Sequence, residues 1–401
     1  MDHIQLEYII PFQWKSQEVS PKKTSFLKES ISVKINVRYV DASFRTARGT
    51  VVVEGERIAA LLPFDGGKED DGLLCLPGFI DIHTHGGAGA DCCGKTPEAL
   101  QTLSRYYASH GVTSWCPTTM TLPHDELCEV FRAVEAVRGS EDGATIRGVN
   151  LEGPYVSRAK CGAQNPAYLR PADPDEVRAL HAISPIRLVD AAPEVEGALA
   201  LPRALGGEIV CSVAHTNATY AETRAAFDAG YTHVTHLFNA MSPFTHRAPG
   251  AVGAVFENAR VTAELICDGF HLDPVAVRLV FRLLGANRCV AVSDSLPCAG
   301  CPDGDGYALG GQQVAVKDGR AFLKDGTIAG STTNLFQGFR NLLRFGVPFA
   351  DALAACTINP ARVIGADKDA GSMEEGKRAD LIFVDDSMNL KHVMVKGKMI
   401  F

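Results

Sequence analysis

The sequence predicts an α/β fold: a (β/α)8 TIM-like barrel of parallel strands, with a small β-sandwich domain built from both termini. Apolar runs alternate with helical patterns over residues 75–365, and eight of these runs are strand candidates. Shorter alternating patterns flank this stretch on both sides. A chain of 401 residues, 46% hydrophobic and 21% charged, is large enough for a barrel and an accessory domain.

Sequence patterns near both ends of the chain predict the accessory domain. Residues 1–32 are poorly patterned and are interpreted as an N-terminal extension of unknown role. Residues 33–64, 379–384 and 392–396 contain short β-rich runs separated by turns, as in a small sheet. We therefore expect residues 33–74 and 370–401 to form one β domain, and residues 75–369 to form the barrel domain.

The strands of the barrel are nearly continuous apolar runs, as expected for strands buried on both faces. They are predicted at residues 75–82, 112–117, 146–151, 186–191, 208–214, 232–235, 261–266 and 289–293. Helical periodicity is clearest over residues 97–109, 124–137, 220–229 and 274–284, with two further helices at 334–345 and 350–356. A doubly wound open sheet is the alternative architecture.

The first barrel strand ends in a His-x-His motif, His83 and His85, followed by Gly86 and Gly87. Residues i and i+2 of an extended chain point to the same side, so both imidazoles face one place. Neutral imidazole is the commonest protein ligand of metals. Taken alone, the motif fits two surface histidines equally well.

Polar side chains also follow most of the other strands. Six strand ends together carry His83, His85, Glu152, His215, His236, Asp268 and Asp294. Any one of them could merely cap the next helix. In a parallel barrel, however, the carboxyl ends of all strands meet at one rim, where active sites lie.

The residue types at this rim favour metal-assisted hydrolysis. Glu152, His215 and His236 make a His₂Glu set, which catalytic zinc sites use while leaving a position open for water. His83 and His85 could hold a second metal beside it. Asp294 suits a general base, because a metal lowers the pKa of water to about 7 and a carboxylate then needs only to accept the proton.

At this point the chain resembles the amidohydrolase superfamily, and more closely the N-acetylglucosamine-6-phosphate deacetylases. The resemblance runs from about residue 33 to the end. It rests on Pro77-Gly78-Phe79-Ile80-Asp81, Leu151-Glu152-Gly153-Pro154, His215-Thr216-Asn217-Ala218-Thr219, Thr235-His236-Leu237-Phe238-Asn239-Ala240-Met241, Asp268-Gly269-Phe270-His271, Val292-Ser293-Asp294, Ala329-Gly330-Ser331 and Asn359-Pro360-Ala361.

The resemblance implies a role for each matching residue. Glu152, His215 and His236 would bind the catalytic metal, and His83 and His85 match members that carry a second one. The expected metal is divalent, zinc first, with iron, manganese or cobalt as alternatives, one or two per subunit. Asp294 would take a proton from the attacking water and pass it to the leaving amine.

The resemblance also implies contacts to a sugar phosphate substrate. Asn239 and Ala240 would hold the phosphate, partly through backbone N–H groups, and His271 would add a positive or hydrogen-bonding contact. Arg247 would reach across the interface of a homodimer into the neighbouring subunit's site. A guanidinium suits this task because its forked donors match phosphate oxygens.

One position departs from the family pattern. Twelve residues after Glu152 the family places a histidine that contacts the N-acetyl carbonyl, and here that position is Gln164. A glutamine amide can donate a hydrogen bond to a developing oxyanion but cannot carry charge. We expect Gln164 to preserve the geometry, with slower turnover or a shifted substrate.

Composition narrows the remaining choices. A formal net charge of −8 argues against a nucleic-acid surface, and no apolar stretch approaches the ~18 residues of a membrane helix. Twelve scattered cysteines suggest buried thiols in a reducing cytoplasm rather than disulfides. Two alternatives to the deacetylase remain. One is a cyclic amidase of the dihydroorotase or hydantoinase type, which is disfavoured because residues 186–194 lack the strand-four lysine that such enzymes modify. The other is a metal-free scaffold with an amidohydrolase fold.

Overall fold

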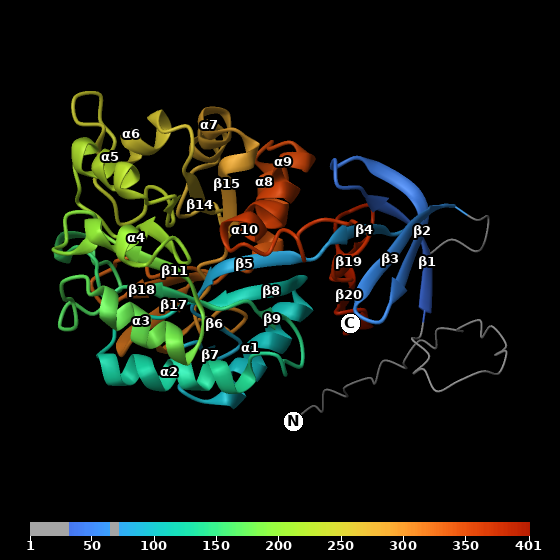
Figure 1. Cartoon of the computed structure of the whole chain (residues 1–401), viewed down its shortest axis with the longest axis horizontal. Helices are drawn as coiled ribbons and strands as arrows, with labels where there is room; N and C mark the ends of the chain where they lie inside the picture. The colour runs from blue at the N-terminus through green and yellow to red at the C-terminus, as the bar shows by residue number, and fades with distance from the viewer. Residues whose placement is uncertain (1–31, 65–71) are drawn as a thin grey trace.

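The computed structural model describes residues 32–64 and 72–401. The predicted extension, apart from Ser32, lies outside the described residues. Figure 1 shows two parts: a large α/β body and a smaller β sheet beside it, to which both ends of the described chain contribute. The fold class predicted from the sequence is confirmed.

Eight parallel strands form the barrel. They are β5 (Phe79–Thr84), β8 (Val112–Pro117), β10 (Val149–Glu152), β11 (Ile186–Ala191), β12 (Val210–Val213), β13 (His233–Val234), β14 (Thr262–Ile266) and β15 (Cys289–Val292). Strands β10 to β15 form one six-stranded sheet, and β5 and β8 pair with the short β9 (Thr145–Ile146) in another. Contacts between the two sheets close the barrel: Thr118 bridges to Asn150, and the Asp294 N–H donates to the His83 carbonyl over 2.9 Å.

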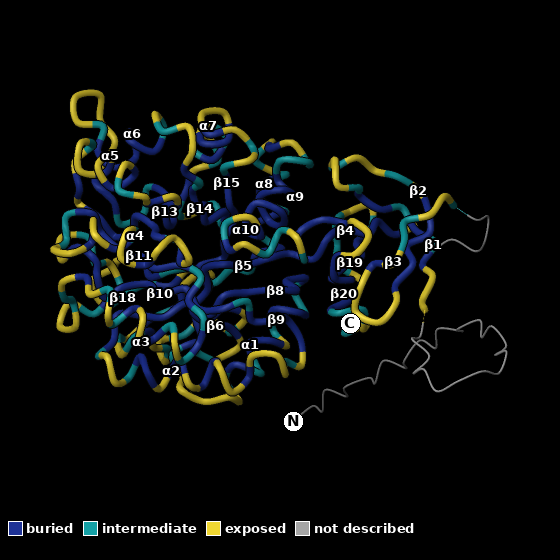
Figure 2. The backbone as a smooth tube through the Cα atoms, in the orientation of Figure 1, coloured by how far each residue is buried: buried dark blue, intermediate teal, exposed yellow. Residues whose placement is uncertain are grey.

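Helices surround the barrel with their exposed faces outward (Figure 2). The main ones are α1 (Pro97–Ser109), α2 (His124–Val137), α3 (Pro174–Ile183), α5 (Tyr220–Ala229), α6 (Gly250–Glu257), α7 (Pro274–Leu284), α8 (Leu335–Arg344), α9 (Phe349–Cys356) and α10 (Ile358–Val363), with the one-turn α4 (Leu201–Ala204). Four, namely α1, α2, α5 and α7, begin where the periodicity predicts. In α1, α5 and α7 a side chain satisfies a first N–H group, and in α1 and α7 proline also starts the helix. Thr219, for example, forms a capping box with Glu222 at the start of α5.

The terminal strands form one seven-stranded sheet in the order β21-β20-β19-β4-β1-β2-β3. Its members are β1 (Ser32–Val40), β2 (Thr46–Glu54), β3 (Arg57–Pro63), β4 (Leu74–Pro77), β19 (Leu381–Val384), β20 (Leu390–Val395) and β21 (Lys398–Met399). The sheet has its own apolar core, which includes Val51, Ile58 and Phe383. The exact domain boundaries stay a prediction.

The predicted first strand, residues 75–82, is in fact two strands that meet at Gly78. Residues before it pair in the terminal sheet as β4, and residues after it enter the barrel as β5. Gly78 is needed at this crossing because a Cβ there would lie 2.2 Å from Thr113 Oγ1. An apolar run alone cannot reveal that its two halves belong to different sheets.

A three-stranded antiparallel sheet between β15 and α8 is absent from the predicted elements. It comprises β16 (Gly304–Leu309), β17 (Gln312–Lys317) and β18 (Arg320–Leu323). Leu309 and the following Thr327 and Ile328 line a pocket at the carboxyl end of the barrel. This sheet is therefore a wall of that pocket, and it was missed because Gly and Asp residues in 303–306 read as a turn.

Candidate metal and catalytic site

The polar residues predicted at the strand ends converge. Glu152 is the last residue of β10, and His215, His236 and Asp294 follow β12, β13 and β15. These last three adopt positive φ angles of 42°, 29° and 48°. Such backbone is rare for residues other than glycine and clusters at functional sites, where the surrounding structure imposes it.

Glu152 Oε1 lies at the centre of three imidazole nitrogens. It is 3.1 Å from His215 Nε2, 3.2 Å from His236 Nε2 and 3.5 Å from His83 Nε2. The Nε2 atoms of His215 and His236 are themselves 3.1 Å apart. All four side chains are at least nine-tenths buried.

Neighbouring groups fix which nitrogen carries the proton. His215 Nδ1 lies 2.9 Å from the carbonyl oxygen of Lys160, which can only accept, so Nδ1 donates and Nε2 presents its lone pair. His83 Nδ1 likewise lies 2.9 Å from Glu264 Oε2. A hydrogen bond to the second nitrogen is how metal-binding histidines are oriented.

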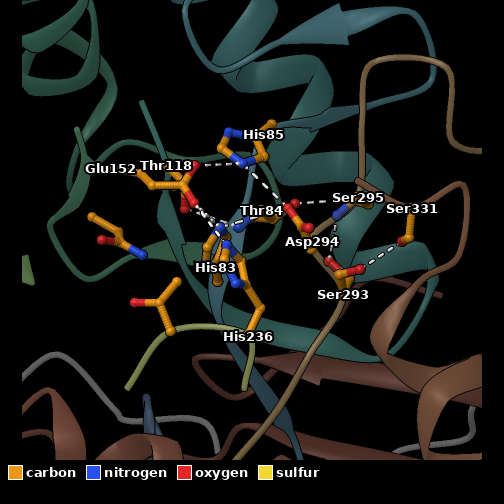
Figure 3. Close-up of polar contacts among 12 residues, drawn as sticks. His83, Thr84, His85, Thr118, Glu152, His236, Ser293, Asp294, Ser295 and Ser331 are labelled. Carbon is orange, nitrogen blue, oxygen red and sulfur yellow. Dashed lines mark hydrogen bonds and ion pairs between the residues drawn. The ribbon is translucent and has the colours of Figure 1, made fainter. Parts of the chain in front are cut away.

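His85 joins the second oxygen of Glu152 to Asp294, as Figure 3 shows. Its Nε2 is 3.2 Å from Glu152 Oε2 and 3.2 Å from Asp294 Oδ1. Burial alone would lower the pKa of His85, but hydrogen bonds to the two carboxylates outweigh it and raise the pKa to about 9. Burial would raise the pKa of Asp294, yet the nearby histidines lower it, so Asp294 is ionised.

This donor set fits a divalent metal. Nitrogen and oxygen ligands about 2.0–2.2 Å from a tetrahedral zinc lie roughly 3.3 Å from each other, close to the observed spacings. His83 Nε2 is buried and has no hydrogen-bond partner among the described residues, which is the expected state of a nitrogen reserved for a cation. Two overlapping groups could each hold an ion: His83, Glu152 and His236, and His83, His85 and Asp294.

The predicted substrate residues divide into two groups. Gln164, Asn239, Ala240 and His271 line the same pocket of about 420 Å³ as the metal donors. Arg247 does not line it within one chain; it is exposed in the loop between β13 and α6. Burial alone would lower the pKa of His271, but its hydrogen bond to Asp268 raises it, which favours the cation.

Two residues of the site were missed by sequence reasoning. Glu264, fully buried on β14, contacts His83 Nδ1 and lies 3.2 Å from His233 Nε2, and it accepts from the backbone N–H of His236. The sequence feature that could have revealed Glu264 is a charged residue inside an otherwise apolar strand. The carbonyl of Lys160 left no signal, because a backbone contact does not depend on residue type.

Comparison of the sequence with known proteins defines the protein family. The amidohydrolase family profile matches residues 74–400. An N-acetylgalactosamine-6-phosphate deacetylase of Escherichia coli O157:H7 is 37% identical over 85% of this chain and 92% of its own. An N-acetylglucosamine-6-phosphate deacetylase of Bacillus subtilis is 36% identical, with coverages of 82% and 85%. The chain belongs to the amidohydrolase family.

Comparison with solved structures identifies the subfamily within the amidohydrolases. An N-acetylglucosamine-6-phosphate deacetylase from Pasteurella multocida has a TM-score of 0.86 at 28% identity, covering 92% of this chain and 99% of its own. A Mycobacterium smegmatis variant in complex with N-acetyl-D-glucosamine-6-phosphate has a TM-score of 0.85 at 31% identity, with the same coverages. Within the amidohydrolases, the chain is a member of the N-acetylglucosamine-6-phosphate deacetylase family.

Proposed function

We propose that this protein removes the acetyl group from N-acetylglucosamine 6-phosphate, or a close N-acetyl hexosamine phosphate, by metal-dependent hydrolysis. The products are acetate and the amino sugar phosphate. The observation that carries the proposal is the convergence of Glu152, His215 and His236 beside an ionised Asp294 in one pocket. Family membership supplies the substrate class.

Glu152, His215 and His236 would hold the catalytic metal, and His83 and His85 a second one. When bound, such a metal polarises a carbonyl and makes a nucleophilic water available near neutral pH. Zinc is the metal we favour, because His₂Glu sets are typical of catalytic zinc. Iron, manganese and cobalt remain alternatives for the same donors.

Asp294 would carry the proton. In the proposed reaction its carboxylate accepts a proton from the attacking water and then gives it to the nitrogen of the leaving amine. The low pKa of Asp294 keeps it ready to accept at neutral pH. When His85 binds no second metal, its hydrogen bond to Asp294 holds the carboxylate on the side of the pocket where the metal donors converge.

The phosphate would lie near Asn239, Ala240 and His271. Ala240 has a positive φ of 50°, in the turn over residues 237–240 that follows β13. His271, whose pKa is raised by Asp268, would add positive charge within the chain. A net charge of −8 makes such local positive charge necessary for an anionic substrate.

Arg247 would complete the phosphate site from the other subunit of a homodimer. Its exposure and its absence from the pocket of a single chain support this arrangement, as does the exposed Phe244 in the same loop. Mixing Arg247→Met with Asp294→Asn subunits tests it. If Arg247 acts across the interface, the mixture regains activity that neither variant has; if Arg247 acts within its own chain, it does not.

A cytoplasmic location completes the proposal. All twelve cysteines lie in the described residues and are free thiols, as in a reducing compartment. Among the described residues, no helix is both long and apolar enough to cross a bilayer.

The experiment that tests the proposed function is acetate release from a panel of substrates. The panel contains N-acetylglucosamine 6-phosphate, N-acetylgalactosamine 6-phosphate and the two unphosphorylated sugars, each with zinc, iron, manganese or cobalt added. We expect release from a phosphorylated sugar, loss of activity after chelation, and recovery on metal addition. Equal activity on the unphosphorylated sugars would contradict the phosphate site, and no release from any member would overturn the function.

A further inference from the structure

The side chain of Gln164 is held by contacts at both ends of its amide. Its Oε1 accepts from the backbone N–H of Thr121 over 2.7 Å, and its Nε2 donates to Glu152 Oε2 over 2.7 Å. The same Nε2 lies 3.8 Å from the sulfur of Met120. Gln164 is only 2% exposed, so water does not compete for these contacts.

These partners allow one orientation of the amide. The Thr121 N–H can only donate, and a carboxylate such as Glu152 can only accept. A flipped amide would therefore place donor against donor at Thr121 and acceptor against acceptor at Glu152. Both N–H bonds of Gln164 are also engaged, one by Glu152 and the other in the direction of Met120. The N–H that Glu152 accepts is not available to an acyl oxygen of the substrate, and the second would have to leave its weak contact with Met120.

The contact with Gln164 decides how Glu152 presents its two oxygens. Oε2 is held by Gln164 and His85, while Oε1 faces His215 and His236. The loop that carries Gln164 is itself fixed, because Gln312 of β17 donates to the Ala163 carbonyl over 2.5 Å. The carboxylate is therefore prevented from rotating away from the two imidazoles.

We propose that Gln164 is a positioning residue: it holds Glu152 Oε2 so that Oε1 is the oxygen offered to the metal with His215 and His236, and it does not contact the substrate. This differs from the role of the histidine that the family pattern places here, which contacts the N-acetyl carbonyl. The inference rests on the proposed function, since it concerns the same metal site. Oriented partners of this kind typically change metal affinity 10–100-fold when removed.

The test is the zinc affinity of the Gln164→Met variant, measured by competition with a chromogenic chelator. Methionine has nearly the same length but cannot donate a hydrogen bond to Glu152. We expect zinc binding about 10–100-fold weaker than in the wild type. Unchanged zinc affinity with a kcat about 10²–10³-fold lower would identify a substrate-facing oxyanion donor and overturn the inference.

Gln312→Met is the matched control. It makes the same substitution at a glutamine that contacts the same loop but not Glu152, so it loosens the loop while leaving the contact with Glu152, and we expect a smaller loss of zinc affinity than in Gln164→Met. An equal loss in both variants would mean that general loosening of the loop, rather than the contact with Glu152, weakens zinc binding. That result would also overturn the inference.

A second measurement uses the unmodified protein, so it does not depend on the folding of a variant. In a crystal structure with zinc, acetate and the amino sugar phosphate, Gln164 Nε2 should remain within hydrogen-bond distance of Glu152 Oε2. A Gln164 amide turned toward the acetate would contradict the positioning role. Neither the zinc competition nor this structure requires turnover. An inactive wild-type protein would therefore overturn the proposed function, while these two measurements would still decide whether Gln164 positions Glu152.

Discussion

Replacing Asp294 by asparagine removes the proposed proton carrier while preserving its shape. Among the described residues that line the pocket, only Glu152 and Asp294 are carboxylates, and Glu152 is assigned to the metal. No second carboxylate is therefore placed to take over the proton transfer. An asparagine Oδ1 can still accept from His85, whose Nε2 lies 3.2 Å from Asp294 Oδ1, so the histidines should keep their positions.

The expected loss of activity follows because Asp294 is the one pocket carboxylate, among the described residues, that is not assigned to the metal. Positioned acid–base groups contribute about 10²–10⁴-fold to rate, or about 3–5.5 kcal/mol of transition-state free energy at 1.36 kcal/mol per tenfold. We expect Asp294→Asn to lower kcat by that factor and to leave KM within a few-fold. The zinc content should match that of the wild type, because Glu152, His215 and His236 are untouched.

The assay is acetate release under saturating substrate, with zinc content measured on the same samples. Asp175→Asn, whose side chain is 84% exposed at the start of α3, is the matched control and should behave as wild type. A zinc-loaded Asp294→Asn protein that retains kcat within about fivefold of wild type would refute the reasoning. Loss of zinc together with activity would instead show that Asp294 belongs to the metal ligands.

Three further predictions concern stability. Gly78→Ala should destabilise the fold by about 1–3 kcal/mol in a urea titration, because its Cβ would meet Thr113 Oγ1 at 2.2 Å. Its control, Gly306→Ala, should be nearly neutral, because no atom lies within 4 Å of the new Cβ. Equal effects of the two substitutions would contradict the packing argument. Thr219→Ala should cost about 0.5–2 kcal/mol through loss of the α5 capping box, and a wild-type urea midpoint would argue against it. Burial would raise the pKa of Glu176, but hydrogen bonds from Arg170 and Tyr155 lower it below the ordinary 4.5. Its contribution to stability is therefore complete above pH ~4.5 and declines as the pH falls through the lowered pKa, so the stability difference between wild type and Glu176→Gln should shrink from pH 7 toward pH 3, and a pH-independent difference would contradict this.

The barrel and its rim could be predicted from sequence because both depend on local patterns. Apolar runs mark strands, and parallel strands bring their carboxyl ends to one edge, so Glu152, His215 and His236 could be grouped without coordinates. Helices α1, α2, α5 and α7 have the predicted bounds, since proline or a capping side chain marks three of their starts and periodicity marks the rest.

What could not be predicted depends on contacts between distant segments. Gly78 separates two sheets because of Thr113, which lies on the next barrel strand. The partners of Gln164 are a backbone N–H and a carboxylate on other segments, so its residue type suggested only a generic donor. Glu264 on β14 contacts His83 on β5, past the intervening β15, a pairing that strand patterns do not encode.

The most direct test of the central claim is to locate the metal itself. Crystals of the zinc-loaded protein, measured at wavelengths on either side of the zinc absorption edge, give the ion's position from its anomalous signal alone. The geometry predicts a peak about 2.0–2.2 Å from Glu152 Oε1, His215 Nε2 and His236 Nε2. A zinc peak that lacks any of these three atoms as a ligand, or a site that stays empty at saturating zinc, would contradict it.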